Sequence, residues 1–175
     1  TNYAFLRGAS HPHELVQQAH ALGLAAIGIT DRNAVAGVVR AHVQAKDLGM
    51  RIVPGCRLVF SDGTPDILAY PRDRAAWGRL CRLLTTGNRR AEKGDCILRL
   101  EDLIEHAEGL QLILLPPRPD IGLATPTLKR LAHTRLWLGA AMRYRGDDLR
   151  HLKRLEALAR EHRIPMIATN DVLYH

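Results

Sequence analysis

The chain alternates short apolar runs with amphipathic, helix-like stretches along its whole length. Leu24–Thr30, Leu110–Leu115 and Ile164–Thr169 are apolar along nearly all of their length, which is typical of strands buried on both faces of a sheet. Between such runs, apolar residues recur at helical spacing, as in the stretch 149–159. This alternation predicts an α/β fold with a mainly parallel sheet that is covered by helices and is either open or closed as a barrel.

Six segments qualify as strands: 24–30, 51–60, 65–70, 110–115, 135–144 and 164–169. The turn Ser61–Thr64 has hairpin chemistry, so the strands on either side of it are expected to form a hairpin-like pair. Helices are expected over 10–23, 33–49 and 73–87, in a short stretch ending by Gly109, over 126–133, and from Gly146 onward. In the last helix, Leu149, Leu152, Leu155 and Leu158 are expected to face the core. The proline-rich segment 116–125 is expected to be a surface loop.

Two of the strands end in similar polar sequences. Thr30-Asp31-Arg32-Asn33 follows the first strand, and Thr169-Asn170-Asp171 follows the last. Chemistry in α/β proteins usually sits at the carboxyl ends of parallel strands, so Asp31 and Asp171 are expected at the same rim. Two roles remain open for them. Converging carboxylates are ligands in hydrolytic metal sites, whereas a carboxylate directly before a helix usually caps it.

Other residues suited to chemistry lack the partners that they need. His11 and His13 form a His-x-His pair, but the pair begins a helix, and His42 has no second ligand one turn away. Cys56 has no patterned histidine partner, so a cysteine protease is weakly supported. The chain has no dinucleotide-binding glycine pattern, no P-loop and no Gly-x-Ser-x-Gly sequence. A Rossmann dinucleotide site, a P-loop nucleotide site and a serine nucleophile elbow are therefore unsupported.

Length and composition indicate a single globular domain. The 175 residues are 46% hydrophobic and 25% charged, which is ordinary for a folded domain and atypical of disorder. No apolar run approaches the ~18 residues of a membrane span. The three cysteines are widely spaced and contain no Cys-x-x-Cys pair, which favours reduced thiols in the cytoplasm over a zinc ribbon or disulfide framework. Because the chain starts without an initiator methionine or leader, we expect it to be cut from a longer protein.

The formal charge is +7 and the isoelectric point is about 9.8, which suits an anionic partner such as nucleic acid. In the sequence, however, the basic residues are dispersed rather than gathered in one stripe, and aromatic residues make up only 5%. A stacking platform for single-stranded nucleic acid is therefore poorly supported. A stand-alone nucleic-acid-binding module remains an alternative that rests on charge alone.

Four separated stretches resemble one known family and occur in its order: Thr1–Pro12, Ile29–Asn33, Arg72–Leu84 and Ile167–His175. They are similar to the polymerase and histidinol phosphatase (PHP) domain of bacterial C-family DNA polymerases, and within it to the error-prone branch. The resemblance covers residues 1–175 as a single domain. It implies a distorted (βα)7 barrel of TIM-like type with a metal cluster at the carboxyl ends of its strands. The family's first strand, which bears a His-x-His pair, is expected just before Thr1 and so to be missing.

The resemblance also implies that the metal site is vestigial. Active members of the family have Thr-Asp-His at Thr30-Asp31-Arg32, a glutamate at Arg57, a histidine at Asp66 and a closing Asp-x-His at Asp171-Val172-Leu173. Two aspartates are thus kept, while the ligands become Arg32, Arg57 and Leu173. Arginine stays protonated and is a poor metal ligand, but it pairs well with carboxylates. We therefore expect no metal, no catalytic residue and no cofactor in this fragment, with fixed positive charge in place of the ions.

The resemblance implies a parent enzyme that is a DNA-directed DNA polymerase of damage-induced mutagenesis and translesion synthesis, using magnesium and dNTPs in domains outside this chain. The fragment is then expected to be a structural or docking domain. Its partners would be the remaining polymerase domains, DNA through the parent enzyme, and other mutagenesis proteins, with no membrane. The competing reading is an active metal-dependent phosphoesterase, either a pyrophosphatase or a 3′–5′ exonuclease.

Overall fold

The computed structural model describes residues 1–4, 7–144, 146–170 and 172. It contains one sheet of six strands in the order β1-β2-β3-β4-β5-β6. The strands are β1 (Ala26–Arg32), β2 (Arg51–Leu58), β3 (Ile67–Pro71), β4 (Leu110–Leu114), β5 (Arg135–Ala140) and β6 (Met166–Ala168). The pairs β1–β2, β4–β5 and β5–β6 are parallel, and β3 runs antiparallel to both of its neighbours. The predicted mainly parallel sheet and the hairpin-like pair of β2 and β3 are confirmed.

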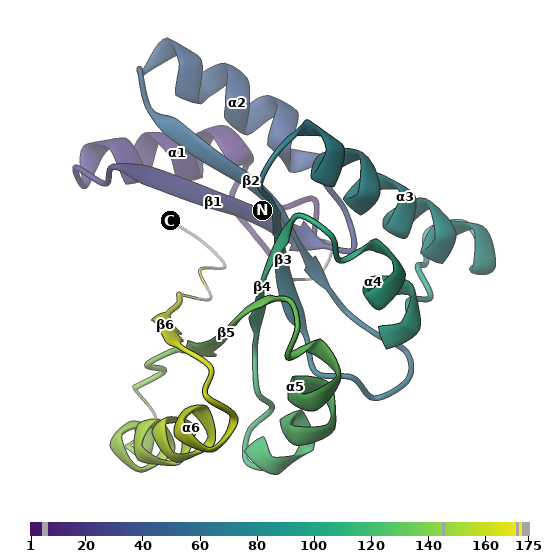
Figure 1. Cartoon of the computed structure of the whole chain (residues 1–175). Coiled ribbons are helices and arrows are strands. Elements are labelled where there is room, and N and C mark those ends of the chain that lie inside the picture. Colours follow the sequence, from purple (N-terminus) through teal and green to yellow (C-terminus); the bar gives the residue numbers. More distant parts are fainter. Residues whose placement is uncertain (5–6, 145, 171, 173–175) are drawn as a thin grey trace.

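The sheet curves into a half-barrel with helices on its outer side (Figure 1). The helices are α1 (Pro12–Ala21), α2 (Gly37–Asp47), α3 (Arg74–Arg90), α4 (Leu100–His106), α5 (Thr125–Leu131) and α6 (Asp148–His162), with a short 3-10 turn at Ile121–Ala124. In the sheet order, β1 and β6 are the two edges, and they lie on opposite sides of the open interior (Figure 1). This architecture fits the expected distorted TIM-like fold of PHP type.

Two apolar clusters hold the helices to the sheet. A small one joins α1, β1 and α2 through Val16, Ile29, Ala41 and Ala45. A larger one packs β2 to β5 against α3 to α6, with fully buried leucines such as Leu80, Leu112 and Leu138. Each fully buried leucine contributes roughly 1.5–3 kcal/mol relative to exposure. Both clusters lie on the convex side of the sheet. The alternate side chains of the same strands therefore line the concave side.

Several predicted boundaries are wrong for identifiable physical reasons. Strand β1 runs on to Arg32, so α2 begins at Gly37 rather than at Asn33. Helix α3 continues through Gly87 to Arg90. Gly87 lies inside the helix and has a packing role instead of a terminating one. A Cβ there would lie 2.6 Å from the Cys96 sulfur, so the glycine lets the following loop pack against the helix. The proline-rich segment is partly helical, since it contains the 3-10 turn and the first residue of α5.

Helix α6 presents a different face to the sheet from the one predicted. Leu155 and Leu158 are buried as expected, but Leu149 is 71% exposed and Leu152 is 37% exposed. Asp148 and His151 take their places on the inner side. The reason is that the Asp148 carboxylate accepts a hydrogen bond from the Arg143 amide and pairs with the Arg118 guanidinium at 2.9 Å. These polar contacts orient the start of the helix.

Candidate functional site

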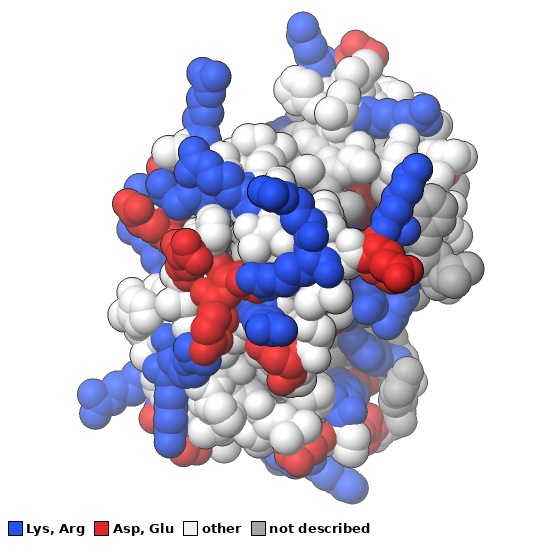
Figure 2. All heavy atoms as spheres, turned by 90° about the vertical axis from the view of Figure 1, so that its right-hand side faces the viewer, with Lys and Arg blue, Asp and Glu red and all other residues white. Residues whose placement is uncertain are grey.

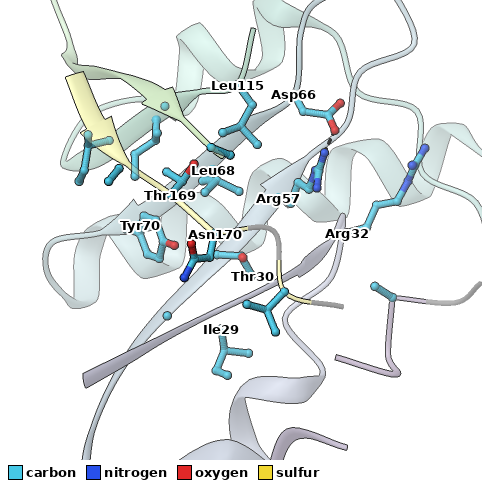
Figure 3. Close-up of a pocket in the computed structure, with 18 of the residues that line it drawn as sticks. Ile29, Thr30, Arg32, Arg57, Asp66, Leu68, Tyr70, Leu115, Thr169 and Asn170 are labelled. Carbon is cyan, nitrogen blue, oxygen red and sulfur yellow. Dashed lines mark hydrogen bonds and ion pairs between the residues drawn. The ribbon is translucent and has the colours of Figure 1, made fainter. Parts of the chain in front are cut away.

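The concave side of the half-barrel is a cavity of about 1350 Å³. Its mouth is formed by residues at and just beyond the carboxyl ends of the parallel strands, as expected for a site in an α/β fold. Thr30 and Arg32 come from β1, Arg57 from β2, and Thr169 and Asn170 follow β6. Figure 3 shows these side chains around one opening, with Asp66 beside Arg57. The strand ends that the sequence singled out are therefore brought together.

Two arginines lie at neighbouring strand ends at this mouth. Arg32 and Arg57 are directly paired in the register of β1 and β2, and both line the cavity. The Arg57 Nε donates to Asp66 Oδ2 at 2.8 Å. The Arg57 and Asp66 side chains are only 21% and 26% exposed, so water screens this ion pair less than a surface pair. The sequence suggested that Arg32 and Arg57 pair with the retained Asp31 and Asp171. Among the described residues, the partner seen for Arg57 is instead Asp66, and Asp31 is bound by Thr1.

Asp31 lies on the other face of β1. Side chains alternate along a strand, and Asp31 points toward the N-terminal segment and α2 while Thr30 and Arg32 line the cavity. Its Oδ1 accepts hydrogen bonds from the Thr1 nitrogen and the Thr1 hydroxyl, both at 2.7 Å. Its Oδ2 lies so close to Gly37 that a Cβ there would be 2.3 Å away. At 1% exposure, Asp31 anchors the N-terminal segment, and it neither caps α2 through an amide nor reaches the cavity in the described part of the chain.

Asn33, which was expected to cap a helix, ties the ends of two strands together instead. Its backbone adopts a left-handed conformation with φ of 46°, which asparagine tolerates better than most residues. Its side-chain amide donates to the Val59 carbonyl at 3.0 Å, and its side-chain oxygen accepts from the Val59 amide at 2.8 Å. Asn33 therefore fixes the exit of β1 against the exit of β2, which keeps Arg32 and Arg57 adjacent.

Tyr70 fills the floor of the cavity, a role that the sequence analysis missed. A Cβ on Gly55 would lie 2.6 Å from the Tyr70 ring, and one on Gly28 would lie 3.0 Å from its hydroxyl. The two strand glycines therefore make room for the ring. Burial raises the pKa of Tyr70, although a hydrogen bond with Thr30 acts in the opposite direction. Glycines inside two neighbouring strand candidates were the available signal for a large side chain at this place.

A second polar cluster borders the same cavity. The Arg118 guanidinium pairs with Asp147 at 3.2 Å and Asp148 at 2.9 Å, and it also donates to the Ala141 carbonyl at 3.1 Å. His151 lies beside it, and burial, followed by the charge of Arg118, lowers the pKa of His151. Its imidazole is therefore held in the neutral form, which suits a packed residue beside a cation.

The donors that the described residues supply do not fit the metal cluster that the fold family implies. Among the described residues, no group of three or more His, Cys, Asp or Glu side chains is placed to hold a metal ion. The stacked rings of His11 and His13 do not line the cavity, and a nitrogen of His11 is 2.9 Å from the Asn2 amide. Asp171 and Leu173 lie outside the described residues, so their expected positions at the rim stay predictions.

Cys56 is not arranged as a nucleophile. It lies on β2, fully buried in the larger apolar cluster, and its thiol donates to the Asp31 carbonyl at 3.4 Å. Burial raises the pKa of Cys56 to about 12, so the reactive thiolate is scarcely populated near neutral pH.

No helix in the described part of the chain is both long and apolar enough to cross a membrane.

The sequence is similar to bacterial polymerases along its whole length. It is 50% identical, over an alignment of 183 residues, to the error-prone DNA polymerase of Brucella abortus, and the match covers all of this chain and 17% of that protein. It is 52% identical over 178 residues to the error-prone DNA polymerase of Caulobacter vibrioides, of which it covers 16%. The chain thus spans about one sixth of the length of these relatives.

Solved structures show the same fold at low sequence identity. An amidohydrolase from Chromobacterium violaceum superposes with a TM-score of 0.64 at 16% identity, covering 96% of this chain and 84% of that one. A two-domain protein from Bacteroides vulgatus, described as containing a predicted PHP-like metal-dependent phosphoesterase, superposes with a TM-score of 0.66 at 14% identity, covering 98% of this chain and 50% of that one. The model of the PHP domain family matches residues 1–161. With this match, and with strand ends that converge on one cavity, the chain belongs to the PHP domain family.

Proposed function

We propose that the chain is the N-terminal PHP domain of an error-prone DNA polymerase, a cytoplasmic nucleotidyltransferase of DNA replication and repair that acts in damage-induced mutagenesis and translesion synthesis. The identity of 50–52% to proteins of that name supports this reading. The parent enzyme would use magnesium and dNTPs in domains beyond this chain. The domain itself would contact those polymerase domains, and through them DNA and other mutagenesis proteins.

The proposed role of the domain is structural rather than hydrolytic. The observation that carries this proposal is the pair of guanidiniums at the mouth of the cavity, where Arg57 holds the Asp66 carboxylate at 2.8 Å. A guanidinium is permanently charged and has no lone pair for a metal. It does supply a fixed positive charge to a nearby carboxylate. Arg32 and Arg57 would thus keep the barrel mouth electrostatically balanced without ions, and the barrel would persist as a docking scaffold.

A gain-of-binding experiment tests this role. The double variant Arg32→His with Arg57→Glu puts ligand side chains back at two strand ends, while Arg32→Gln with Arg57→Gln removes the same charges without adding strong ligands. Calorimetric titration with Mn²⁺ and Zn²⁺ is expected to show no stoichiometric binding for the unmodified chain or the Gln variant, and binding for the His/Glu variant. Stoichiometric binding by the unmodified chain would refute the substitution of charge for metal and would favour an active phosphoesterase.

A further inference from the structure

Five of the 25 Lys and Arg residues of the chain lie on the single helix α3. The helix has five arginines, Arg74, Arg79, Arg82, Arg89 and Arg90, and contains no Asp or Glu. A helix of 17 residues with this composition is strongly cationic, and repulsion between its own side chains is not relieved from within. Acidic partners for these arginines must come from other elements or from outside the chain.

Helix α4 and the residues that follow it neutralise one flank of α3. Arg90 donates to both carboxylate oxygens of Asp102, at 2.5 and 2.7 Å. Arg79 donates from Nε to the Glu108 carbonyl at 2.7 Å, and its guanidinium lies 3.6 Å from the Glu108 carboxylate. Figure 2 views the molecule from this side and shows Lys and Arg side chains projecting around a central group of Asp and Glu side chains.

The other three arginines remain exposed and unneutralised. Arg74, Arg82 and Arg89 are all exposed, and they form no ion pair or hydrogen bond with any residue that the structure describes. At about 100° per residue they lie within about 80° of the helix circumference, directly opposite the buried Leu80 and Leu83. They span about 22 Å along the axis at 1.5 Å per residue. We call Arg74, Gly78, Arg82, Thr85 and Arg89 the basic strip.

Gly78, in the middle of this strip, also indicates contact with another molecule. A glycine inside a helix destabilises it relative to alanine, so its presence usually has a packing reason. Here a Cβ on Gly78 would meet nothing within 4 Å, and nothing inside the described chain requires the glycine. It lies between Arg74 and Arg82 on the outermost line of the helix. An absent side chain at this place lets another molecule approach the helix backbone closely.

The far end of the strip is hollowed. Thr85, Thr86, Arg89 and Arg90 line a shallow depression of about 330 Å³ on the surface. Arg90 is already paired with Asp102, and the Thr85 hydroxyl donates to the Cys81 carbonyl at 2.8 Å. The Arg89 guanidinium and the Thr86 hydroxyl are therefore the donors in this hollow that can contact phosphate oxygens. The strip offers no exposed aromatic side chain, because Trp77, the only aromatic residue of α3, is half-buried against the core. It therefore suits the backbone of a nucleic acid better than its bases.

We propose that the basic strip of α3 binds the sugar–phosphate backbone of duplex DNA without reading its sequence. Three permanent cations over about 22 Å follow a regularly charged, extended polyanion, and the gap at Gly78 admits a close approach. The proposed polymerase context enters only in the choice of DNA as the polyanion. The charge pattern and the glycine stand without it, and the state of the barrel mouth has no bearing on them.

Salt-dependent DNA binding tests the proposal. Fluorescence anisotropy with a short labelled duplex is measured for the 175-residue chain between about 50 and 200 mM salt. The strip variant replaces Arg74, Arg82 and Arg89 with Gln. Losing three phosphate contacts is expected to reduce the slope of log affinity against log salt by about 2.7. Over this range of salt, the affinity of the unmodified chain should then fall by a factor about 40 times larger than that of the strip variant.

Two further variants make the test specific. A control replaces Arg40, Arg150 and Lys153 with Gln; these cations are also exposed and lie on α2 and α6. It removes the same charge and is expected to leave the slope nearly unchanged. Gly78→Ala is expected to raise the melting temperature while weakening DNA binding several-fold. Equal losses from the strip and control variants, undetectable binding at the lowest salt, or equally strong competition by polyglutamate would each overturn the proposal.

Discussion

The ion pair between Arg57 and Asp66 is expected to stabilise the fold measurably, unlike an ordinary surface pair. Two unit charges at about 4 Å attract by about 4 kcal/mol at an effective dielectric constant of 20, and desolvation and lost side-chain entropy offset much of this. Exposed pairs contribute about 0–1 kcal/mol, whereas breaking a buried pair costs about 3–5 kcal/mol. With side-chain exposures of 21% and 26%, the pair lies between these limits, and a coupling energy of about 1–2 kcal/mol is expected.

A double-mutant cycle in urea unfolding measures this coupling. The variants Arg57→Met, Asp66→Asn and their combination isolate the pair from everything else that either side chain touches. The matched control is the pair Arg130–Glu101, which has a similar distance of 2.9 Å but side-chain exposures of 44% and 67%. Its coupling is expected to be below about 0.5 kcal/mol. If the Arg57–Asp66 coupling is no larger than that of the control, the mouth of the barrel is not held by charge pairing.

Three further changes probe the fold around the site. Gly55→Ala is expected to cost about 1–3 kcal/mol in urea unfolding, because the new methyl group collides with the Tyr70 ring, and Tyr70→Leu in the same chain should recover part of the loss. Asp102→Asn is expected to cost about 1–2 kcal/mol of stability at neutral pH. Because the Arg90 guanidinium lowers the pKa of the Asp102 carboxyl, this cost should fade as the pH drops below the ordinary pKa of 3.8. A cost that persists there would contradict the pairing. Burial and the charge of Arg118 lower the pKa of His151 in the folded chain, so the unfolded chain takes up this proton at a higher pH than the folded chain. The free energy of unfolding, followed by circular dichroism, should therefore fall as the pH drops below 6.5. It should fall less steeply for His151→Gln.

The alternation of strands and helices was readable from the sequence, but the faces of its key residues were not. The sequence indicated correctly that the end of the first strand borders the site. Which side chain enters the cavity depends on where the strand continues, because the period is two residues. Strand β1 runs to Arg32 and is paired up to that residue with β2, so Thr30 and Arg32 face inward and Asp31 faces the helices. That register comes from tertiary pairing.

Long-range contacts account for the other departures from prediction. Asn33 became a clamp between strand ends because its partner, Val59, lies 26 residues away. Helix α6 turned Leu149 outward because Asp148 is bound by Arg118 from a distant loop. Tyr70 gave no signal of its own, although the strand glycines at Gly28 and Gly55 marked the space for it. Local periodicity specified the elements, while their rotation and the lining of the cavity depend on contacts that are remote in sequence.

The barrel is proposed to work without metal ions. The most direct measurement is the metal content of the chain after purification without chelators, by elemental mass spectrometry, together with a phosphoesterase assay in added Mn²⁺ and Zn²⁺. A metal content far below one ion per chain and no hydrolysis above a buffer control are expected. One or more tightly bound ions per chain, or hydrolysis that disappears on chelation, would contradict it and would identify the barrel as an active hydrolase.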